Sequence, residues 1–286
     1  MPVEPPVSSP SSLGEAYALL ADADGWRPVA GGTDLMVQIT GEIGAPPERV
    51  LDIWGLHELR GISTDPTDGA LVLGALTTYT EIRRSALVAG ELPALAEAAA
   101  TIGAAQIQNR GTIGGNIVNG SPAGDTLPVL LAVDAEIVMG SASGERAVAA
   151  RDFWTGYRIT ARRADELVVR IRIPVPAGRE VRFRKVGTRR AQAISKVVMA
   201  ISWRPDGGVW RDVRVALGSV AATPIRARET EGALEGAAPR RETADHAVST
   251  ITNEIKPIDD VRSTAEYRRF VTGRILHRLL RDAGGW

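Results

Sequence analysis

The stretch from Gln106 to Glu136 reads QIQNRGTIGGNIVNGSPAGDTLPVLLAVDAE and carries the most informative pattern in the chain. It passes through two glycine-containing turns, Thr112–Asn116 and Ser121–Asp125, before an apolar run from Leu127 to Val133. Adjacent glycines tolerate positive φ angles and lack the Cβ that would hold a ligand away from the backbone. The freed backbone N–H groups could therefore surround a polyanion or the polar rim of a cofactor. The side chains placed to assist are those of Thr112, Asn116, Asn119 and Ser121.

Asp125, at the end of the second turn, has two expected roles. Its carboxylate can cap a helix that begins at Thr126, and it can accept a hydrogen bond from a ligand hydroxyl. The alternative for the whole stretch is two ordinary tight turns followed by a capping aspartate. Glycine turns taken alone favour that alternative, so the functional interpretation needs a second signal.

A second signal lies near the N-terminus, in Trp26–Ile39, which reads WRPVAGGTDLMVQI. A short β-like run leads into Gly31-Gly32, and Thr33-Asp34 opens a helix-like segment. A strand, a glycine turn and a helix N-terminus form a phosphate-binding geometry, because unpaired N–H groups and the helix dipole both face the anion. The turn is not a G-x-G-x-x-G motif and lacks the lysine of a P-loop. We expect Asp34 to cap the helix with its carboxylate turned away from a phosphate.

The composition is that of an ordinary globular protein. The chain has 286 residues, enough for one large domain or two to three small ones, and is 44% hydrophobic and 24% charged. Lys+Arg and Asp+Glu both number 34, which argues against a general nucleic-acid-binding role. The sequence contains neither an apolar run of about 18 residues nor a signal-peptide core. We therefore expect no membrane span and a cytoplasmic location.

Cysteine is absent from the sequence, which excludes disulfides, thiolate metal sites, cysteine-held iron–sulfur clusters and cysteine nucleophiles in this chain. The three histidines, His57, His246 and His277, are far apart and form no HExxH-type pair. We expect each to be a surface or helix-packed residue, so no metal site is predicted. No acid–base pair or nucleophile–histidine pair suited to substrate chemistry is evident, so no catalytic residue is predicted either.

Local patterns predict individual elements along the rest of the chain. Ala70–Leu76 predicts a strand that runs into a helix N-cap at Thr77-Thr78. Glu166–Pro174 alternates between apolar and charged residues and predicts another strand. Gln192–Trp203 and Arg214–Thr223 predict two strands in the C-terminal part of the chain.

Three motifs occur in order along the chain: AGGTDL at Ala30–Leu35, TIGGN at Thr112–Asn116 and SPAGD at Ser121–Asp125. Together they resemble the FAD-binding subunit of the molybdenum hydroxylases, the xanthine dehydrogenase and carbon monoxide dehydrogenase family. The resemblance implies an α+β fold with a two-lobed FAD-binding domain of the PCMH (vanillyl-alcohol-oxidase-like) type at residues 1–176. Its lobes would cover about 1–54 and 55–176, and a smaller α/β C-terminal domain with a short antiparallel sheet and helices would cover 177–286.

Further segments extend the resemblance over nearly the whole chain. Leu73–Thr78 resembles the family's loop beside the flavin, and Leu167 or Val168 matches a residue that packs on the flavin side. Lys185 matches a lysine that contacts the flavin region in the family; the alternative for it is a solvated strand lysine. Asp259–Arg269 resembles the family's last signature, in which we expect a capping box of Ser263 and Glu266 to begin the final helix.

The resemblance implies a set of cofactor-binding residues in this chain, where the flavin carries the redox reaction and the protein positions it. They are Ala30, Gly31, Gly32, Thr33, Asp34, Leu35, Thr77, Ile102, Gly111, Thr112, Gly114, Gly115, Asn116, Asn119, Ser121, Asp125, Leu167, Val168 and Lys185.

The same resemblance implies partner subunits. Substrate hydroxylation would occur at a molybdopterin site on a large subunit, and [2Fe–2S] clusters on a small subunit would deliver electrons to FAD, in a dimer of heterotrimers. FAD in this chain would pass the electrons to NAD+ or another acceptor. The absence of cysteine agrees, because the clusters must then lie on another chain.

Two departures from the family bear on the branch. The carbon monoxide dehydrogenase branch shows an AGGHSL-like loop where this chain has AGGTDL, and a tyrosine near the flavin where this chain has Ala193-Ile194. These differences favour the purine or the aldehyde and aromatic-heterocycle branches. Two other functions stay open: a stand-alone flavin oxidase or dehydrogenase of the same fold, and a nucleotide-binding module without redox turnover.

Overall fold

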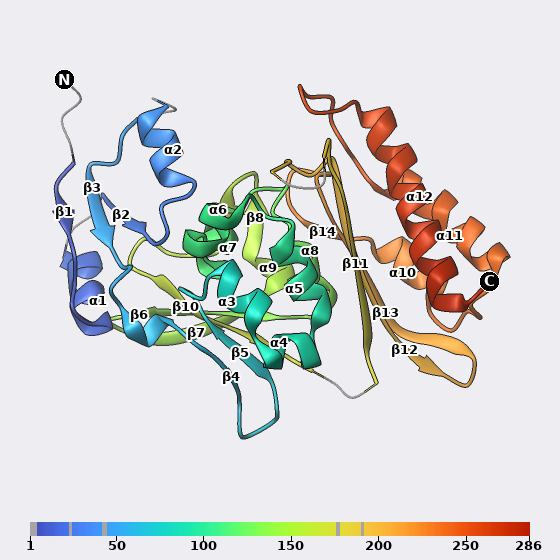
Figure 1. The fold of residues 1–286 in the computed structure, drawn as a ribbon, viewed down its shortest axis with the longest axis horizontal. Helices are drawn as coiled ribbons and strands as arrows, with labels where there is room; N and C mark the ends of the chain where they lie inside the picture. The colour runs from blue at the N-terminus through green and yellow to red at the C-terminus, as the bar shows by residue number, and fades with distance from the viewer. Residues whose placement is uncertain (1–4, 23–24, 42–44, 176–177, 190–191) are drawn as a thin grey trace.

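The computed structural model describes residues 5–22, 25–41, 45–175, 178–189 and 192–286. The expected boundary between residues 176 and 177 lies outside this described part. Figure 1 shows the chain as three consecutive parts placed side by side, with the N-terminus at one end of the molecule and the C-terminus at the other. We call residues 5–54 the N-terminal lobe, 55–175 the middle lobe and 178–286 the C-terminal domain.

The N-terminal lobe is built on a small parallel sheet in the strand order β1-β3-β2. Its elements are β1 (Val7–Ser8), α1 (Leu13–Asp22), β2 (Trp26–Val29), α2 (Leu35–Thr40) and β3 (Arg49–Asp52). Parallel neighbours need a crossover connection, and the glycine turn with α2 lies in the connection between β2 and β3. The predicted glycine loop Ala30–Leu35, called the first loop below, therefore begins at the carboxyl end of a sheet strand. The loop Thr112–Asn116 is called the second loop.

The middle lobe contains an antiparallel sheet in the order β4-β5-β10-β6-β7, covered by helices. Its strands are β4 (Ile62–Thr64), β5 (Leu71–Gly74), β6 (Glu136–Ser141), β7 (Gly144–Ala149), β8 (Trp154–Gly156), β9 (Ile159–Thr160) and β10 (Leu167–Ile173). Its helices are η1 (His57–Leu59), α3 (Tyr79–Arg84), α4 (Ala86–Glu91), α5 (Pro93–Ala100), α6 (Ala105–Arg110), α7 (Ile113–Asn119), α8 (Leu127–Ala132) and α9 (Ala150–Phe153).

The predicted strand-to-helix junction at the start of α3 is confirmed. Thr78 is the N-cap, its side chain accepts a hydrogen bond from the Glu81 amide, and the Glu81 carboxylate accepts one from the Thr78 amide. Such a reciprocal capping box satisfies two of the backbone donors that a helix start leaves unpaired. The strand itself, β5, ends at Gly74, two residues before the predicted limit.

The C-terminal domain has an antiparallel sheet in the order β11-β12-β13-β14 with three long or medium helices on one side (Figure 1). Its elements are β11 (Glu180–Val186), β12 (Val197–Asp206), β13 (Val209–Gly218), β14 (Ile225–Arg226), α10 (Arg228–Leu234), α11 (Arg241–Glu254) and α12 (Ala265–Gly284).

Three predictions for this domain had wrong boundaries. β12 begins at Val197 and not at Gln192, whose φ of 51° is incompatible with a strand. β13 begins at Val209 and ends at Gly218, so it starts earlier than predicted. The N-cap of the final helix is Thr264, whose hydroxyl accepts from the Tyr267 amide, so the predicted Ser263 and Glu266 capping box is wrong by one residue.

The C-terminal sheet joins two hydrophobic cores. One of its faces packs on α5 and α8 of the middle lobe, and the other packs on α10 and α12, so the sheet lies between two helical layers (Figure 1). Phe183, Val198, Ala200 and Ala216 belong to the same buried cluster as the middle-lobe helices. Burial of this shared apolar surface is the main force that holds the domain against the middle lobe.

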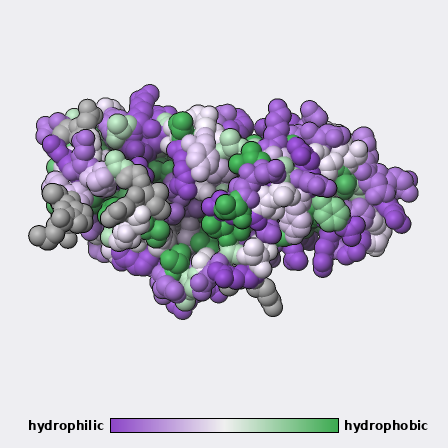
Figure 2. Space-filling model, turned by 90° about the horizontal axis from the view of Figure 1, so that it is seen from above, coloured by the Kyte–Doolittle hydropathy of each residue, from purple (hydrophilic) through white to green (hydrophobic). Residues whose placement is uncertain are grey.

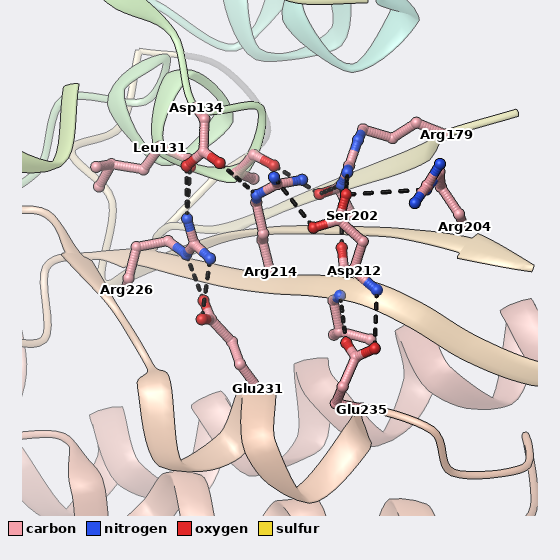
Figure 3. A network of polar contacts seen from close by, with 12 residues as sticks. Leu131, Asp134, Arg179, Ser202, Arg204, Asp212, Arg214, Arg226, Glu231 and Glu235 are labelled. Carbon is pink, nitrogen blue, oxygen red and sulfur yellow. Dashed lines mark hydrogen bonds and ion pairs between the residues drawn. The ribbon is translucent and has the colours of Figure 1, made fainter. Parts of the chain in front are cut away.

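A chain of charged side chains runs across the same junction (Figure 3). Asp134, just after α8, accepts from Arg214 at 2.7 Å and from Arg226 at 2.8 Å. Arg214 also contacts Asp212 at 3.1 Å, and Arg226 continues to Glu231. The Arg226 side chain is only 6% exposed, so its charge depends on these two carboxylates.

The molecular surface offers no continuous apolar face in the view of Figure 2, where hydrophobic residues form small patches among hydrophilic ones. Among the helices that the structure describes, none is long and apolar enough to cross a membrane.

Replacing Asp134 by Asn tests the charged junction. Asn keeps the size of the side chain and tolerates the positive φ of 50° at this position, so the variant removes mainly the charge. Two arginines then face each other, and we expect the free energy of unfolding to fall by about 1–3 kcal/mol in urea denaturation.

The matched control is Asp152→Asn, which breaks an exposed pair whose atoms lie 3.5 Å apart. Exposed pairs contribute little, so the control should change the free energy by less than about 0.5 kcal/mol. Equal effects of the two variants would show that the junction does not depend on these ion pairs.

Candidate cofactor site

A cleft lies between the N-terminal lobe and the middle lobe. One side is formed by β2 and the loop Ala30–Leu35, and the other by the start of α7 together with Leu167 and Val168 at the start of β10. The residues that line it are Arg27, Pro28, Val29, Ala30, Gly31, Gly32, Thr33, Asp34, Leu35, Gln38, Ile53, Ala75, Leu76, Tyr79, Thr112, Gly114, Gly115, Asn116, Val118, Asn119, Arg162, Leu167 and Val168. Of the three predicted glycine turns, those at Ala30–Leu35 and Thr112–Asn116 therefore meet at one cleft, whereas the turn at Ser121–Asp125 does not line it.

The two glycine loops are held together by close backbone contact. A Cβ on Gly31 would lie 1.7 Å from the carbonyl oxygen of Arg110, so the first loop packs directly on the residue before the second. A Cβ on Gly114 would lie 2.7 Å from the side chain of Ala75. Real side chains essentially never approach so closely, and both positions require glycine for packing.

Hydrogen bonds fix the second loop to the junction between β5 and α3. The Ile113 amide donates to the Thr77 carbonyl at 3.0 Å, and the Gly114 amide donates to the Ala75 carbonyl at 2.9 Å. The Gly115 amide donates to the hydroxyl of Thr112, which is the N-cap of α7. The prediction of free N–H groups in this turn is wrong at these three positions, because the turn is the first turn of a helix docked on a neighbouring segment.

The backbone amides of the first loop, Ala30–Leu35, are not paired in this way. Within the described residues, the backbone N–H groups of Gly32, Thr33 and Asp34 have no hydrogen-bond acceptor. Gly32 has a φ of 74°, a conformation that glycine adopts without strain. The following helix, α2, is only six residues long, so the loop amides themselves and not a helix dipole are the donors offered to an anion.

The predicted capping role of Asp34 is wrong. Asp34 occupies the N-cap position of α2, yet its side chain makes no capping hydrogen bond. Its carboxylate instead accepts from the amide group of Asn119 at 3.0 Å, across the cleft. Asn119 in turn accepts from Arg158 at 2.5 Å, so a polar bridge links the first loop to the end of α7.

Asp125 belongs to a buried polar cluster beside the cleft. The prediction that Asp125 caps the next helix is wrong, because the N-cap of α8 is Thr126 and that helix has no side-chain cap. The Lys185 ammonium donates to the Asp125 carboxylate at 2.6 Å, and Ser195 donates to its other oxygen. The side chains of Asp125 and Lys185 are both 8% exposed, so the solvated alternative for Lys185 is wrong.

Burial raises the pKa of Asp125, while the neighbouring Lys185 ammonium acts in the opposite direction. The lysine also donates to the Thr101 carbonyl at 3.0 Å. The cluster joins β11 of the C-terminal domain to the middle lobe, and Thr126 connects it to the cleft by donating to Asn116 at 2.6 Å.

The structure brings most of the predicted residues together. Those that line the cleft are Ala30, Gly31, Gly32, Thr33, Asp34, Leu35, Thr112, Gly114, Gly115, Asn116, Asn119, Leu167 and Val168. Those that do not line it are Thr77, Ile102, Gly111, Ser121, Asp125 and Lys185. Thr77 is buried and donates to the Gly61 carbonyl, and Gly111 packs against the ring of Tyr79. Thr77 and Gly111 therefore support the residues that line the cleft without lining it themselves.

Several residues of the cleft lie outside the predicted cofactor-binding set, among them Tyr79, Arg27 and Arg162. Burial lowers the pKa of Arg162, and the charge of Arg27 lowers it further. Both arginines line the cleft. Arg162 donates to three backbone carbonyls, and neither arginine has a carboxylate partner in the described chain. No motif marks such residues; only their spatial convergence does.

These features fit a dinucleotide cofactor. Unpaired amides and two arginines suit phosphate oxygens, whose anionic charge prefers such donors. Ile53, Leu76 and Leu167 supply an apolar wall for a flat ring system. A cleft with few polar groups on apolar walls is the usual form of a cofactor site.

Comparisons with known proteins identify the family. Residues 3–176 match the family described as FAD binding domain in molybdopterin dehydrogenase, and residues 182–283 match the CO dehydrogenase flavoprotein C-terminal domain. The chain is 36% identical to the glyceraldehyde dehydrogenase medium chain of Sulfolobus acidocaldarius, covering 91% of each chain. It is 32% identical to the xanthine dehydrogenase FAD-binding subunit of Escherichia coli O157:H7, covering 96% of each.

The fold agrees with a solved structure as well. The carbon monoxide dehydrogenase of Hydrogenophaga pseudoflava that lacks the Mo-pyranopterin moiety of its cofactor superposes with a TM-score of 0.92 at 34% identity, covering 97% of this chain and 96% of that one. The chain therefore belongs to the FAD-binding subunits of the molybdenum hydroxylase family. It is an oxidoreductase flavoprotein subunit, and the predicted α+β fold with a smaller C-terminal domain is confirmed.

Gly31→Ala tests the contact between the two glycine loops. The added methyl group would collide with the Arg110 carbonyl, and backbone must move to admit it. We expect the free energy of unfolding to fall by at least about 2 kcal/mol, and the affinity for FAD to fall with it.

Gly90→Ala is the control, because a Cβ there meets nothing within 4 Å and the residue lies in α4. Alanine favours a helix over glycine, so this variant should be as stable as the parent or more stable by about 0.5–1 kcal/mol. Urea denaturation measures both, and a harmless Gly31→Ala would contradict the packing argument.

Proposed function

We propose that this chain is the electron-transferring FAD subunit of a molybdenum hydroxylase complex. In this proposal, electrons arrive from [2Fe–2S] clusters on a small partner subunit and leave to NAD+ or another acceptor. The observation that carries it is the cleft where the glycine loops at Ala30–Leu35 and Thr112–Asn116 converge, with unpaired amides at Gly32–Asp34. A buried lysine–aspartate pair outside the lining is linked to this cleft through Thr126 and Asn116. The absence of cysteine from the sequence supports placing the clusters on another chain.

The chain's own residues would hold and orient the cofactor. The amides of Gly32–Asp34 would bind the diphosphate, and the walls around Leu76 and Leu167 would exclude water from a ring. FAD supplies the redox chemistry when bound. Lys185, fixed by Asp125, would place a positive charge near the site and favour negative charge on the reduced ring.

The wider assembly is part of the same proposal. A large molybdopterin subunit would carry out the hydroxylation, and two heterotrimers would associate in the cytoplasm. The sequence departures at Ala30–Leu35 and at Ala193-Ile194 lead us to place the complex in the branches of the family that act on purines, aldehydes or aromatic heterocycles. The domain limits at 1–176 and 177–286, and the binding roles assigned to single residues, stay predictions.

The first experiment is a visible absorption spectrum of the purified chain, followed by release and chromatography of the bound molecule. We expect two flavin bands and about one FAD per chain, and a pull-down should then recover the large and small subunits. A colourless chain that also fails to take up added FAD would contradict the proposal. A flavin-containing chain that recovers no partners would favour a stand-alone flavin oxidase.

Lys185→Ala tests the charge beside the flavin. Loss of the ammonium removes a stabilising charge from the reduced cofactor, so we expect the midpoint potential of the bound flavin to fall by about 30 mV or more, or FAD affinity to fall about tenfold. Potentiometric titration and FAD titration measure these quantities.

The substitution leaves Asp125 without its counterion, so a Lys185→Ala/Asp125→Asn double variant is the control for that buried charge. If potential and affinity are unchanged in both variants, Lys185 has no role at the flavin.

A further inference from the structure

Tyr79 presents an unsatisfied donor in the cleft. The residue is 4% exposed and lines the cleft, and its hydroxyl has no hydrogen-bond partner in the part of the chain that the structure describes. Buried polar groups are nearly always paired, because an unmade hydrogen bond costs free energy that the folded state must recover elsewhere. The Tyr79 hydroxyl is not one of the fully enclosed side-chain atoms that lack a partner among the described residues, so it opens into the cleft, where a ligand atom can complete its hydrogen bond.

The backbone around Tyr79 places it at the junction of the two loops. Its amide donates to the Gly111 carbonyl at 3.1 Å, and its ring fills the space that a side chain on Gly111 would need, at 2.8 Å from the ideal Cβ position. The residue before Gly111, Arg110, is the one against which Gly31 packs. The ring is thus clamped beside the loop whose amides at Gly32–Asp34 are unpaired.

The electrostatic surroundings determine what the hydroxyl can do. Burial raises the pKa of Tyr79, and the negative charges of Asp34 and Asp125 raise it further, so the hydroxyl keeps its proton. Asp34 already accepts from Asn119, and Asp125 already accepts from Lys185 and Ser195. The missing partner is therefore an acceptor brought by the ligand, and an anionic oxygen is the strongest one.

We propose that the Tyr79 hydroxyl donates a hydrogen bond to a phosphate oxygen of the FAD diphosphate, next to the amides of Gly32–Asp34. This rests on the flavin site and not on the electron partners. The aromatic ring acts as a rigid support, because its contact with Gly111 fixes the position of the hydroxyl before the ligand arrives. Tyr79 thus joins the two glycine loops as a third element of the diphosphate site.

The test is Tyr79→Phe, which removes one oxygen and keeps the ring. Because the lost hydroxyl is unpaired in the protein, the melting temperature of the flavin-free chain should be unchanged or higher. FAD affinity, measured by flavin fluorescence titration, should fall about tenfold or more, the usual effect of losing a hydrogen bond to a charged group. A purely structural role would instead lower stability and affinity together.

Two further readouts locate the contact on the diphosphate. The visible spectrum and midpoint potential of the bound flavin should stay unchanged, because the hydroxyl does not touch the ring. ADP, which carries the diphosphate without a flavin, should compete with FAD for the parent chain and less well for the variant. Tyr17→Phe is the matched control, since Tyr17 lies on α1 outside the cleft and its hydroxyl also has no partner among the described residues; FAD affinity should not change.

Unchanged FAD affinity in Tyr79→Phe would overturn the proposal. A shifted flavin spectrum, or ADP that fails to compete or competes equally with both chains, would overturn it by placing the hydroxyl elsewhere on the ligand. Failure of the pull-down for partner subunits would refute the proposed electron-transfer complex and leave the Tyr79 result intact. A parent chain that binds no FAD would refute the cofactor site itself, a result separate from any effect of the variant.

Discussion

The close contact between Gly31 and the Arg110 carbonyl is the constraint on which the rest of the site depends. It brings two segments about 80 residues apart in sequence into backbone contact and thereby closes the N-terminal lobe on the middle lobe. In the loop Ala30–Leu35, the amides of Gly32, Thr33 and Asp34 have no acceptor among the described residues. In the second loop, Thr112–Asn116, two amides donate to the carbonyls of Ala75 and Thr77, which makes this loop a rigid support for the first loop.

The C-terminal domain adds a buried polar cluster that lies outside the lining of the cleft. Its strand β11 carries Lys185 into a cluster with Asp125, and the shared apolar face fixes that strand on α5. A charged pair with 8% exposure keeps its position only if surrounding packing holds both partners. The lysine is therefore located by the docking of a whole domain and not by the local sequence around it.

The sequence predicted the fold class and the family correctly, because these depend on local motifs with a fixed order. Its expectation of free N–H groups is wrong at Ile113, Gly114 and Gly115. It placed Thr78 correctly as an N-cap, since a capping box is a local pattern. It failed for Asp34 and Asp125, which looked like caps but form tertiary contacts with Asn119 and Lys185. Tyr79 and Arg162 were missed because their relation to the cleft exists only after the lobes meet.

The shared core between the middle lobe and the C-terminal domain has a consequence for synthesis of the chain. Phe183, Val198 and Ala216 complete a buried cluster whose other members, such as Leu95 and Leu130, are made much earlier. A ribosome extends the chain from the N-terminus. The apolar faces of the middle-lobe helices therefore stay exposed until the last of these strands has been made. The nascent chain is therefore most exposed to chaperones and to misassembly while residues 183–216 are being translated.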